Sequence, residues 1–311
     1  MIHTLKTLKW RVLLSLGLSL LAVTVVVGQE PATSKKWHHK IKDYIYGDPW
    51  KYDSVLYTTH TKVMLGVGRA RIADSYLSPL THAGADFRLK VFIDAPERTK
   101  IWHWYQDIEV NFSPLDNPAN GSVLYHLGGE YSVGPLFKVY DKFGFRVNAG
   151  GLFNLNARTN LKLSNTNNVA NVKASTGLDL MGRAVYRAEF GSYPIMIGYS
   201  TQLSLFHLTF SPEYGQSYYD YISNQNRESI KLYPVFPNSR FNFRQRAVVD
   251  IPIHNTTVSL GVEHLYHSAL VNKIKYEQSH VLFLIGCSFD MVRMAGGKSF
   301  RSKYILNSYH Q

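Results

Sequence analysis

Hydrophobic and polar side chains alternate along most of this chain, in long segments separated by short runs of turn-forming residues. From about Tyr57 onward ten such segments can be marked, each roughly 11–18 residues long. Successive side chains of a β-strand point to opposite faces, so a period of two indicates strands. Strands of soluble proteins usually have about 5–6 residues, whereas a tilted strand that crosses a membrane needs about 9–11. The segment length therefore predicts transmembrane strands.

The two faces of these segments distinguish a membrane barrel from a soluble sandwich. In residues 86–94, Phe87 and Leu89 share one face, while Arg88 and Lys90 share the other. Charged side chains thus occupy the middle of long strands, opposite a band of aliphatic and aromatic ones, as in a barrel that is apolar outside and polar inside. We therefore predict an all-β fold, namely a closed antiparallel transmembrane β-barrel of about 10 strands, within a range of about 8–12.

The alternation of side chains between the two faces of a strand, which we call strand parity, also assigns individual positions to the outer wall. Val91, Ile108, Leu180 and Val249 are expected to touch acyl chains near the middle of the membrane. Arginine at such a position is expected to be tolerated badly. At the inward neighbour Val248 it is expected to be accepted, because that face is already polar.

The connections between the segments differ in length. The short ones lie at residues 95–98, 191–194 and 252–255, and the long ones at residues 75–82, 113–121, 157–172 and 211–239. The connection near Val271-Asn272-Lys273, which alternates with the short ones, is brief. Short periplasmic turns and long external loops are typical of outer-membrane barrels. We therefore expect the N-terminus and the short turns to be periplasmic and the long loops to be external.

Parity places charged residues of both signs in the interior of the barrel. This predicted lumen charge network consists of Asp86, Arg88, Lys90, Asp107, Glu109, Glu130, Arg146, Asp179, Arg183, Arg187, Arg244, Arg246, Asp250 and Glu263. A barrel of about eight to ten strands has an interior that side chains can fill, and buried charges persist when they are paired. We predict a side-chain-filled lumen; the alternative is a narrow pore that conducts anions or cations.

The N-terminal segment predicts export. Lys6, Lys9 and Arg11 precede an apolar run at residues 12–27, and Gly28 follows it. This order is typical of a cleaved signal peptide, and the run is shorter than the about 20 residues of a membrane-spanning helix. We expect a signal peptide at 1–28, a periplasmic lead-in segment at 29–56, the outer-membrane barrel at 57–291 and a C-terminal tail at 292–311. The expected location is the outer membrane of a Gram-negative cell.

Composition agrees with strands and excludes several functions. The chain has 21 Tyr, 16 Phe and 5 Trp but only 18% charged residues, which favours sheet over helix. Its net charge of +12 comes with no basic run longer than Lys35-Lys36, so we do not expect nucleic-acid binding. Cys287 is the only cysteine, which excludes an internal disulfide. We expect no cofactor.

Three stretches carry a resemblance to a known family. They are residues 65–68 leading to 74–80, the block Ser-Pro-Glu-Tyr-Gly-Gln-Ser-Tyr-Tyr within 210–219, and the last strand at 280–289. In these stretches the chain resembles domain-of-unknown-function family 3316. The members of this family are uncharacterised outer-membrane β-barrel proteins of Bacteroidota. The resemblance implies location and architecture and no activity. Residues 291–311 depart from the many such barrels that end close to their last strand.

Candidate catalytic and metal-binding groups are few. His264, Tyr266 and Ser268 share one strand face, where a histidine can activate a hydroxyl, but their parity points outward, so a polar girdle is the preferred interpretation. No Glu-x-x-His motif or cysteine pair accompanies His38-His39, so we expect no metal site. We likewise assign no catalytic residue.

Acid–base chemistry and recognition are the two functions considered for the long loops. An acid–base pair would draw on Asp74, His82 and Asp116, although nothing in their spacing requires it. The loop at 211–239 carries the aromatic residues Tyr214, Tyr218, Tyr219 and Tyr221. Aromatic clusters in loops favour recognition of a partner, and the alternative is that this loop folds inward and caps the barrel.

Together these features predict a non-enzymatic outer-membrane barrel with a structural, binding or accessory role. Its expected partners are outer-membrane lipid and either other outer-membrane proteins or a surface ligand. The alternatives are an outer-membrane hydrolase that acts on lipid or peptide at the barrel rim, and a narrow porin.

Overall fold

The regular elements of the structure are all β-strands. The computed structural model describes residues 55–96, 101–166, 168–190, 193–213, 216–217, 231–253, 256–291 and 304–306. Its strands are β1 (Val55–Tyr57), β2 (Thr59–Asp74), β3 (Thr81–Pro96), β4 (Trp102–Asp116), β5 (Val123–Lys142), β6 (Phe145–Leu161), β7 (Ala170–Phe190), β8 (Tyr193–Phe210), β9 (Leu232–Val235), β10 (Arg240–Ile253), β11 (Thr256–Val271), β12 (Ile274–Met291) and β13 (Tyr304–Leu306). Among the described residues no helix is long and apolar enough to cross a membrane.

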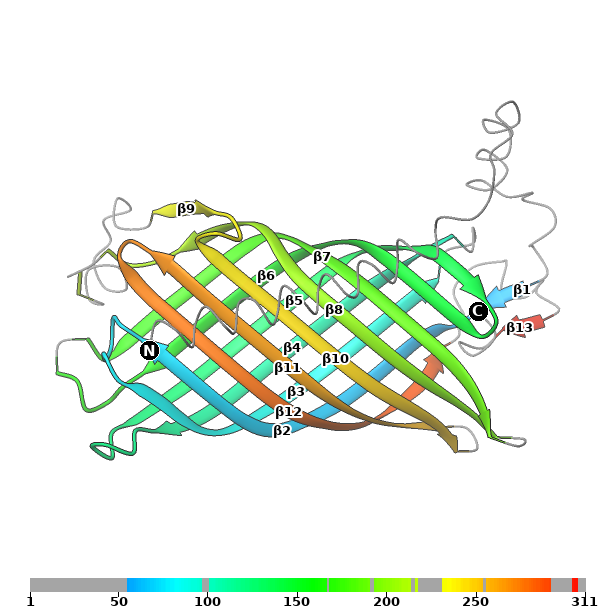
Figure 1. The fold of residues 1–311 in the computed structure, drawn as a ribbon, viewed down its shortest axis with the longest axis horizontal. Coiled ribbons are helices and arrows are strands. Elements are labelled where there is room, and N and C mark those ends of the chain that lie inside the picture. Colours follow the sequence, from blue (N-terminus) through cyan, green and yellow to red (C-terminus); the bar gives the residue numbers. More distant parts are fainter. Residues whose placement is uncertain are drawn as a thin grey trace, which may run out of the picture. The chain divides into compact units, whose positions relative to one another are not determined.

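Ten of these strands close into an antiparallel barrel (Figure 1). Each strand from β2 to β7 pairs with the next one along the chain, and so do β10 and β11. β12 pairs with β2, and β10 pairs with β8 from Phe243 to Asp250, so the ring has no open edge. Such a ring satisfies every strand's backbone hydrogen bonds internally, as the interior of a bilayer requires. The predicted closed barrel of about ten strands is confirmed.

Three short strands lie outside this ring. β9 pairs with the end of β8, from Leu232 opposite Phe210 to Val235 opposite His207. β1 and β13 form a separate parallel pair. β13 belongs to the segment predicted as a C-terminal tail, so that segment contributes a strand beside the residues that precede the barrel.

The two ends of the barrel have different connections. At the short-turn end, where β2 begins, β5 and β6 are joined by Phe143-Gly144, with φ values of 56° and 74°. At the long-loop end the strands continue through parts of the predicted loops 113–121 and 157–172, because β4 extends to Asp116, β6 to Leu161, and β7 starts at Ala170. Those boundaries were predicted wrongly because the polar residues there face inward and keep the period of a strand.

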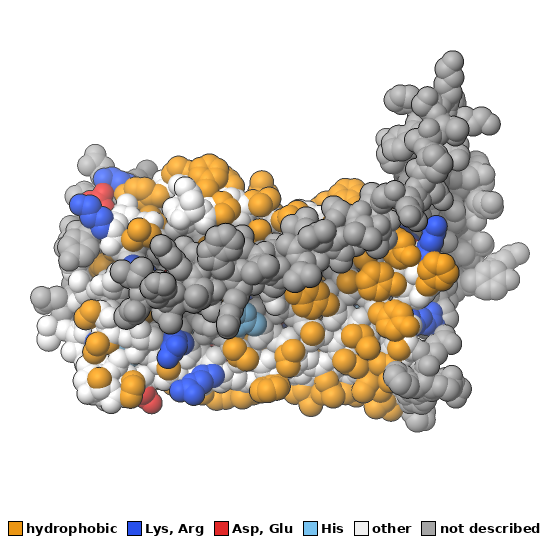
Figure 2. Space-filling view, in the orientation of Figure 1, with side chains coloured by type: hydrophobic (Ala, Val, Ile, Leu, Met, Phe, Trp, Pro, Cys, Tyr) orange, Lys and Arg blue, Asp and Glu red, His pale blue; other side chains and the backbone are white. Residues whose placement is uncertain are grey.

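The outward side chains form an apolar band around the barrel wall. Leu65, Val110 and Phe283 are 57%, 58% and 71% exposed, and Figure 2 shows hydrophobic side chains across the visible wall. Exposed apolar surface on this scale marks a contact with membrane or protein. On β2 the band ends at Arg69 and Arg71, which are exposed on the same face. The outward positions predicted from parity lie on the outer wall: Val91, Ile108, Leu180 and Val249.

The inward side chains form three layers instead of one polar face. Along β4 the inward positions include Tyr105, Asp107, Glu109 and Leu115, so two apolar side chains flank the charged ones. The turn-side apolar cluster consists of Met64, Phe92, Tyr105, Leu136, Leu152, Met181, Val248, Leu282 and Leu284. The loop-side apolar cluster consists of Ala70, Ile72, Leu77, Leu115, Leu124 and Tyr276. Charged side chains fill the space between them.

The turn-side apolar cluster changes one expectation. Val248 is 8% exposed and packs in this cluster. An arginine at Val248 would place a charge inside an apolar layer, where it has no partner. We therefore correct the expectation for this position: arginine at Val248 should be tolerated badly, because the inward face is apolar there.

Inward glycines allow neighbouring strands to approach closely, and this gives a first prediction. A Cβ atom added at Gly68 would lie 1.9 Å from the carbonyl oxygen of Val281, whereas one at Gly198 would lie 3.8 Å from its nearest neighbour, the carbonyl oxygen of Val248. We expect Gly68→Ala to lower the free energy of unfolding by about 2 kcal/mol or more, since overpacking forces the backbone to move. Gly198→Ala is the matched control and should change stability little. Urea unfolding in lipid vesicles measures both, and equal losses would contradict the prediction.

Candidate functional site

The middle layer of the lumen is built on ion pairs, some between neighbouring strands and some between strands that face each other across the lumen. Lys90 on β3 donates to both carboxylate oxygens of Glu263 on β11, at 2.6 and 2.8 Å. Arg246 on β10 lies 2.7 Å from Glu263 and 2.7 Å from Asp107 on β4. Lys90 also contacts Glu109, the next inward residue on β4. These contacts cross the lumen and leave its centre occupied by side chains.

Arg244 links this group to the other side of the lumen. Its guanidinium lies 3.3 Å from Glu109 and 3.1 Å from Glu130 on β5. Glu130 also accepts from Arg158 on β6 at 3.0 Å. Arg88 on β3 pairs with Glu109 and lies 3.0 Å from Asp86.

The resulting central ion-pair network is electrically balanced. Its five cations are Arg88, Lys90, Arg158, Arg244 and Arg246, and its five carboxylates are Asp86, Asp107, Glu109, Glu130 and Glu263. Every member is buried, with at most 7% of its surface exposed. A buried charge is tolerated when it is paired and hydrogen-bonded. The network therefore fills the lumen with salt bridges.

Five residues of the predicted lumen charge network lie outside this network. Asp250 pairs with Lys62 at 2.7 Å. Asp179 lies 2.7 Å from His207 and accepts a hydrogen bond from Gln202 at 2.7 Å.

The other three lie toward the short-turn end. Arg183 pairs with Asp94, and Arg146 lies 3.4 Å from the partly exposed Asp141. Arg187 is half-buried on the same inward side of β7 as Arg183. The structure thus divides the predicted set between the centre of the lumen and its ends.

Asp74 and His82 take positions different from those expected. Asp74 is the last residue of β2 and is 1% exposed, and its carboxylate accepts hydrogen bonds from Asn160 at 2.7 Å and Asn171 at 2.8 Å. His82 lies in β3, with its Nε2 atom 3.0 Å from the Ser122 hydroxyl. The expectation that both lie in external loops is wrong, because the strands extend further than predicted.

Sequence reasoning missed Arg158, although a signal for it was present. Asn154, Asn156, Arg158 and Asn160 alternate with smaller or apolar residues, which is the period of a strand. Part of this run was assigned to a loop because of its polar composition. Inside the barrel these side chains face the lumen. Asn156 and Arg158 both donate hydrogen bonds to the carboxylate of Glu130, each at 3.0 Å.

The remaining predicted groups do not form a site in the described residues. His264, Tyr266 and Ser268 lie on the outward face of β11. Tyr214, Tyr218, Tyr219 and Tyr221 lie outside the described residues, as do His38 and His39. Within the part of the chain that the structure describes, no group of three or more His, Cys, Asp or Glu residues is placed to hold a metal ion.

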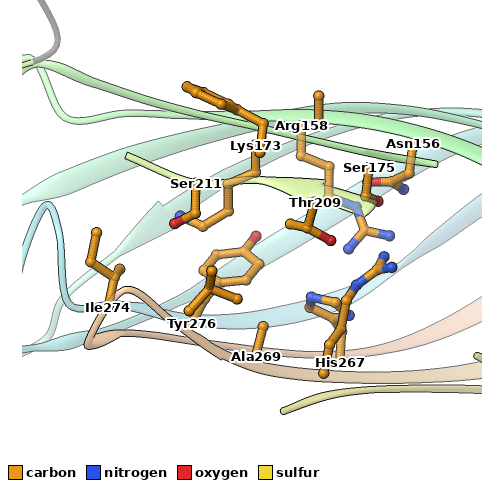
Figure 3. Close-up of a pocket in the computed structure, with 14 residues that line it drawn as sticks. Asn156, Arg158, Lys173, Ser175, Thr209, Ser211, His267, Ala269, Ile274 and Tyr276 are labelled. Atoms are coloured by element: carbon orange, nitrogen blue, oxygen red, sulfur yellow. The ribbon is translucent and has the colours of Figure 1, made fainter. Parts of the chain in front are cut away.

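A cavity of about 30 Å³ opens inside the barrel near the long-loop end. We call it the loop-end cavity. It is lined by residues of β6, β7, β8, β10, β11 and β12, including Arg158, Lys173, Arg240, His267 and Tyr276 (Figure 3). Lys173 donates to Asp74 at 3.2 Å, and its ammonium group lies 4.3 Å from the centre of the Tyr276 ring. None of these residues was singled out from the sequence.

Comparison with solved structures finds outer-membrane β-barrels at very low identity. The outer membrane protease OmpT from Escherichia coli is 7% identical with a TM-score of 0.43, over 75% of this chain and 97% of that one. The beta domain of the Bordetella autotransporter BrkA is 9% identical with a TM-score of 0.38, over 75% and 99%. The translocator domain of the autotransporter NalP from Neisseria meningitidis is 9% identical with a TM-score of 0.33, over 81% and 95%. Likenesses this remote transfer no activity to this chain.

Comparison by sequence identifies a family. No curated protein matches the chain. The model of the family described as "Protein of unknown function (DUF3316)" matches residues 51–298, which include all ten strands of the barrel. The chain therefore belongs to the DUF3316 family.

Proposed function

We propose that this chain is a closed outer-membrane barrel that serves as a structural, binding or accessory component and does not conduct ions. The observation that carries the proposal is the balanced central ion-pair network, whose buried side chains occupy the centre of the lumen. A water-filled pore needs an open polar path from one end to the other, and the paired side chains of this network occupy that path. Barrels of about eight to ten strands are narrow enough for such filling.

The outer surface supports a membrane location. Its apolar band, as at Leu65 and Phe283, suits acyl chains. Trp102 and Trp104 lie at the start of β4 with their rings 5.5 Å apart, as an interfacial aromatic girdle requires. Together with the apolar run at residues 12–27, these features support export through a cleaved signal peptide and insertion with the short turns on the periplasmic side.

The hydrolase alternative has one supporting contact, between His82 and the Ser122 hydroxyl at 3.0 Å. A nucleophilic serine needs a histidine whose second nitrogen is held by a third group. No described carboxylate hydrogen-bonds to His82. The contact therefore favours a structural hydrogen bond, and the non-enzymatic role remains the proposal.

Planar-bilayer recording tests whether the lumen is closed. The wild-type protein, shown to be folded and inserted, is expected to give no steady conductance steps. The double variant Arg246→Ala with Asp107→Ala removes one cation and one carboxylate, so it keeps the charge balance while shortening two side chains that lie 2.7 Å apart. It is expected to conduct more than the wild type. Large, stable, ohmic steps from the wild-type protein would overturn the proposal.

A further inference from the structure

The loop-end cavity carries an excess of positive charge. Arg158, Lys173 and Arg240 contribute to its wall, and none of the described residues that line it is an aspartate or glutamate. Arg158 is held by Glu130 and Lys173 by Asp74, neither of which lines the cavity. Among the described residues the third cation has no such ion pair.

Arg240 is this third cation, and it is buried with no carboxylate of the described residues within 4 Å. It is 3% exposed, and its Nη1 atom has no hydrogen-bond partner among the described residues. The other deeply buried arginines, Arg88, Arg158, Arg244 and Arg246, each lie within 4 Å of a carboxylate. Burying a charge without an ion pair costs free energy. A ligand of opposite charge would therefore stabilise Arg240 at this position.

Two further polar atoms of the cavity wall lack partners in the described structure. They are Nδ1 of His267 and the hydroxyl oxygen of Thr209. Figure 3 shows Arg158, Thr209 and His267 directed toward a common space inside the barrel. Each can donate a hydrogen bond to an oxygen atom placed there.

We propose that the loop-end cavity binds a phosphate group, with Arg240 as its main ligand. A guanidinium is planar and donates two parallel hydrogen bonds to a phosphate. Arg158 and Lys173 add positive potential, and Thr209 and His267 supply further donors. A cavity of about 30 Å³ has room for little more than two water molecules, so it suits one small oxyanion. The phosphate is either a free ion or the terminal group of a larger molecule that reaches in from the long-loop end.

Calorimetric titration of the full-length protein, folded in detergent micelles, tests the proposal. Inorganic phosphate and glycerol phosphate are titrated separately at constant ionic strength, with chloride as the reference anion. We expect saturable binding of at least one phosphate compound and none of chloride. Saturation by inorganic phosphate alone indicates a free ion, and tighter binding of glycerol phosphate indicates the end group of a larger molecule. Binding of neither compound above chloride would overturn the proposal.

Two variants separate the site from the general positive charge of the protein. Arg240→Gln is expected to weaken phosphate binding at least tenfold, whereas Arg69→Gln, on the outward face of β2, should leave it unchanged. In phosphate-free buffer Arg240→Gln should unfold at the same or a higher temperature than the wild type, because it removes an unpaired buried charge. If Arg240→Gln does not fold, Arg240→Lys and Thr209→Val are titrated instead, each with an expected loss of affinity. Equal phosphate affinity in the wild type and in every variant at the cavity would overturn the proposal.

Discussion

Replacing Glu263 with glutamine is expected to lower the free energy of unfolding of the barrel by about 3–5 kcal/mol, because it breaks a buried ion pair on one side only. Glu263 is 1% exposed and accepts hydrogen bonds from Lys90 and Arg246. Glutamine keeps the size of the side chain but leaves Lys90 with one fewer counter-charge inside the lumen. The loss is measured by reversible unfolding in lipid vesicles.

A surface pair gives the matched control for this change. Glu277 on the neighbouring strand β12 lies 3.2 Å from Lys275, whose side chain is 51% exposed. Glu277→Gln should therefore cost only about 0–1 kcal/mol. Adding Lys90→Met to Glu263→Gln removes both partners, and the double variant should lose less than the sum of the two single losses. A loss at Glu263 no larger than that at Glu277 would show that the central ion-pair network does not stabilise the fold.

Val262→Arg, at the residue next to Glu263, is expected to destabilise the barrel in bilayers by about 2–4 kcal/mol for a different reason. Val262 is 48% exposed and points outward from the middle of β11, opposite Phe283 on β12. An arginine there would have to enter the hydrocarbon region of the membrane. Folding yield and unfolding free energy in vesicles measure the effect.

Ser268→Arg is the control on the same face of the same strand. Ser268 lies near the long-loop end of β11, where the cost of a charge falls to about 0–1 kcal/mol at the membrane interface. Because both positions point outward, the comparison isolates depth in the membrane from side-chain direction. If the two variants lose equal stability, the apolar band is not in contact with acyl chains.

The fold was predictable because its signals are local. Strand parity depends only on the backbone of the strand itself, so Val91 and Lys90 were assigned to opposite faces from neighbouring residues alone. The strand length and the number of segments then required a closed barrel of about ten strands. The strand ends were less predictable, since Asn160 and Asn171 are polar residues of a kind that also occurs in loops. Inside the barrel both donate hydrogen bonds to Asp74, which the sequence does not indicate.

The candidate site was predictable only as a set of inward charges. Lys90 and Glu263 are 173 residues apart in the sequence. Which inward charges meet depends on how far the strands are staggered when the ring closes. That stagger is a property of all ten strands together, so the residues of one segment do not determine it. The same holds for Arg240, because ring closure decides which of the described residues surround its guanidinium. The sequence by itself determined which face each side chain takes, and the tertiary structure decided which of the inward charges meet as ion pairs.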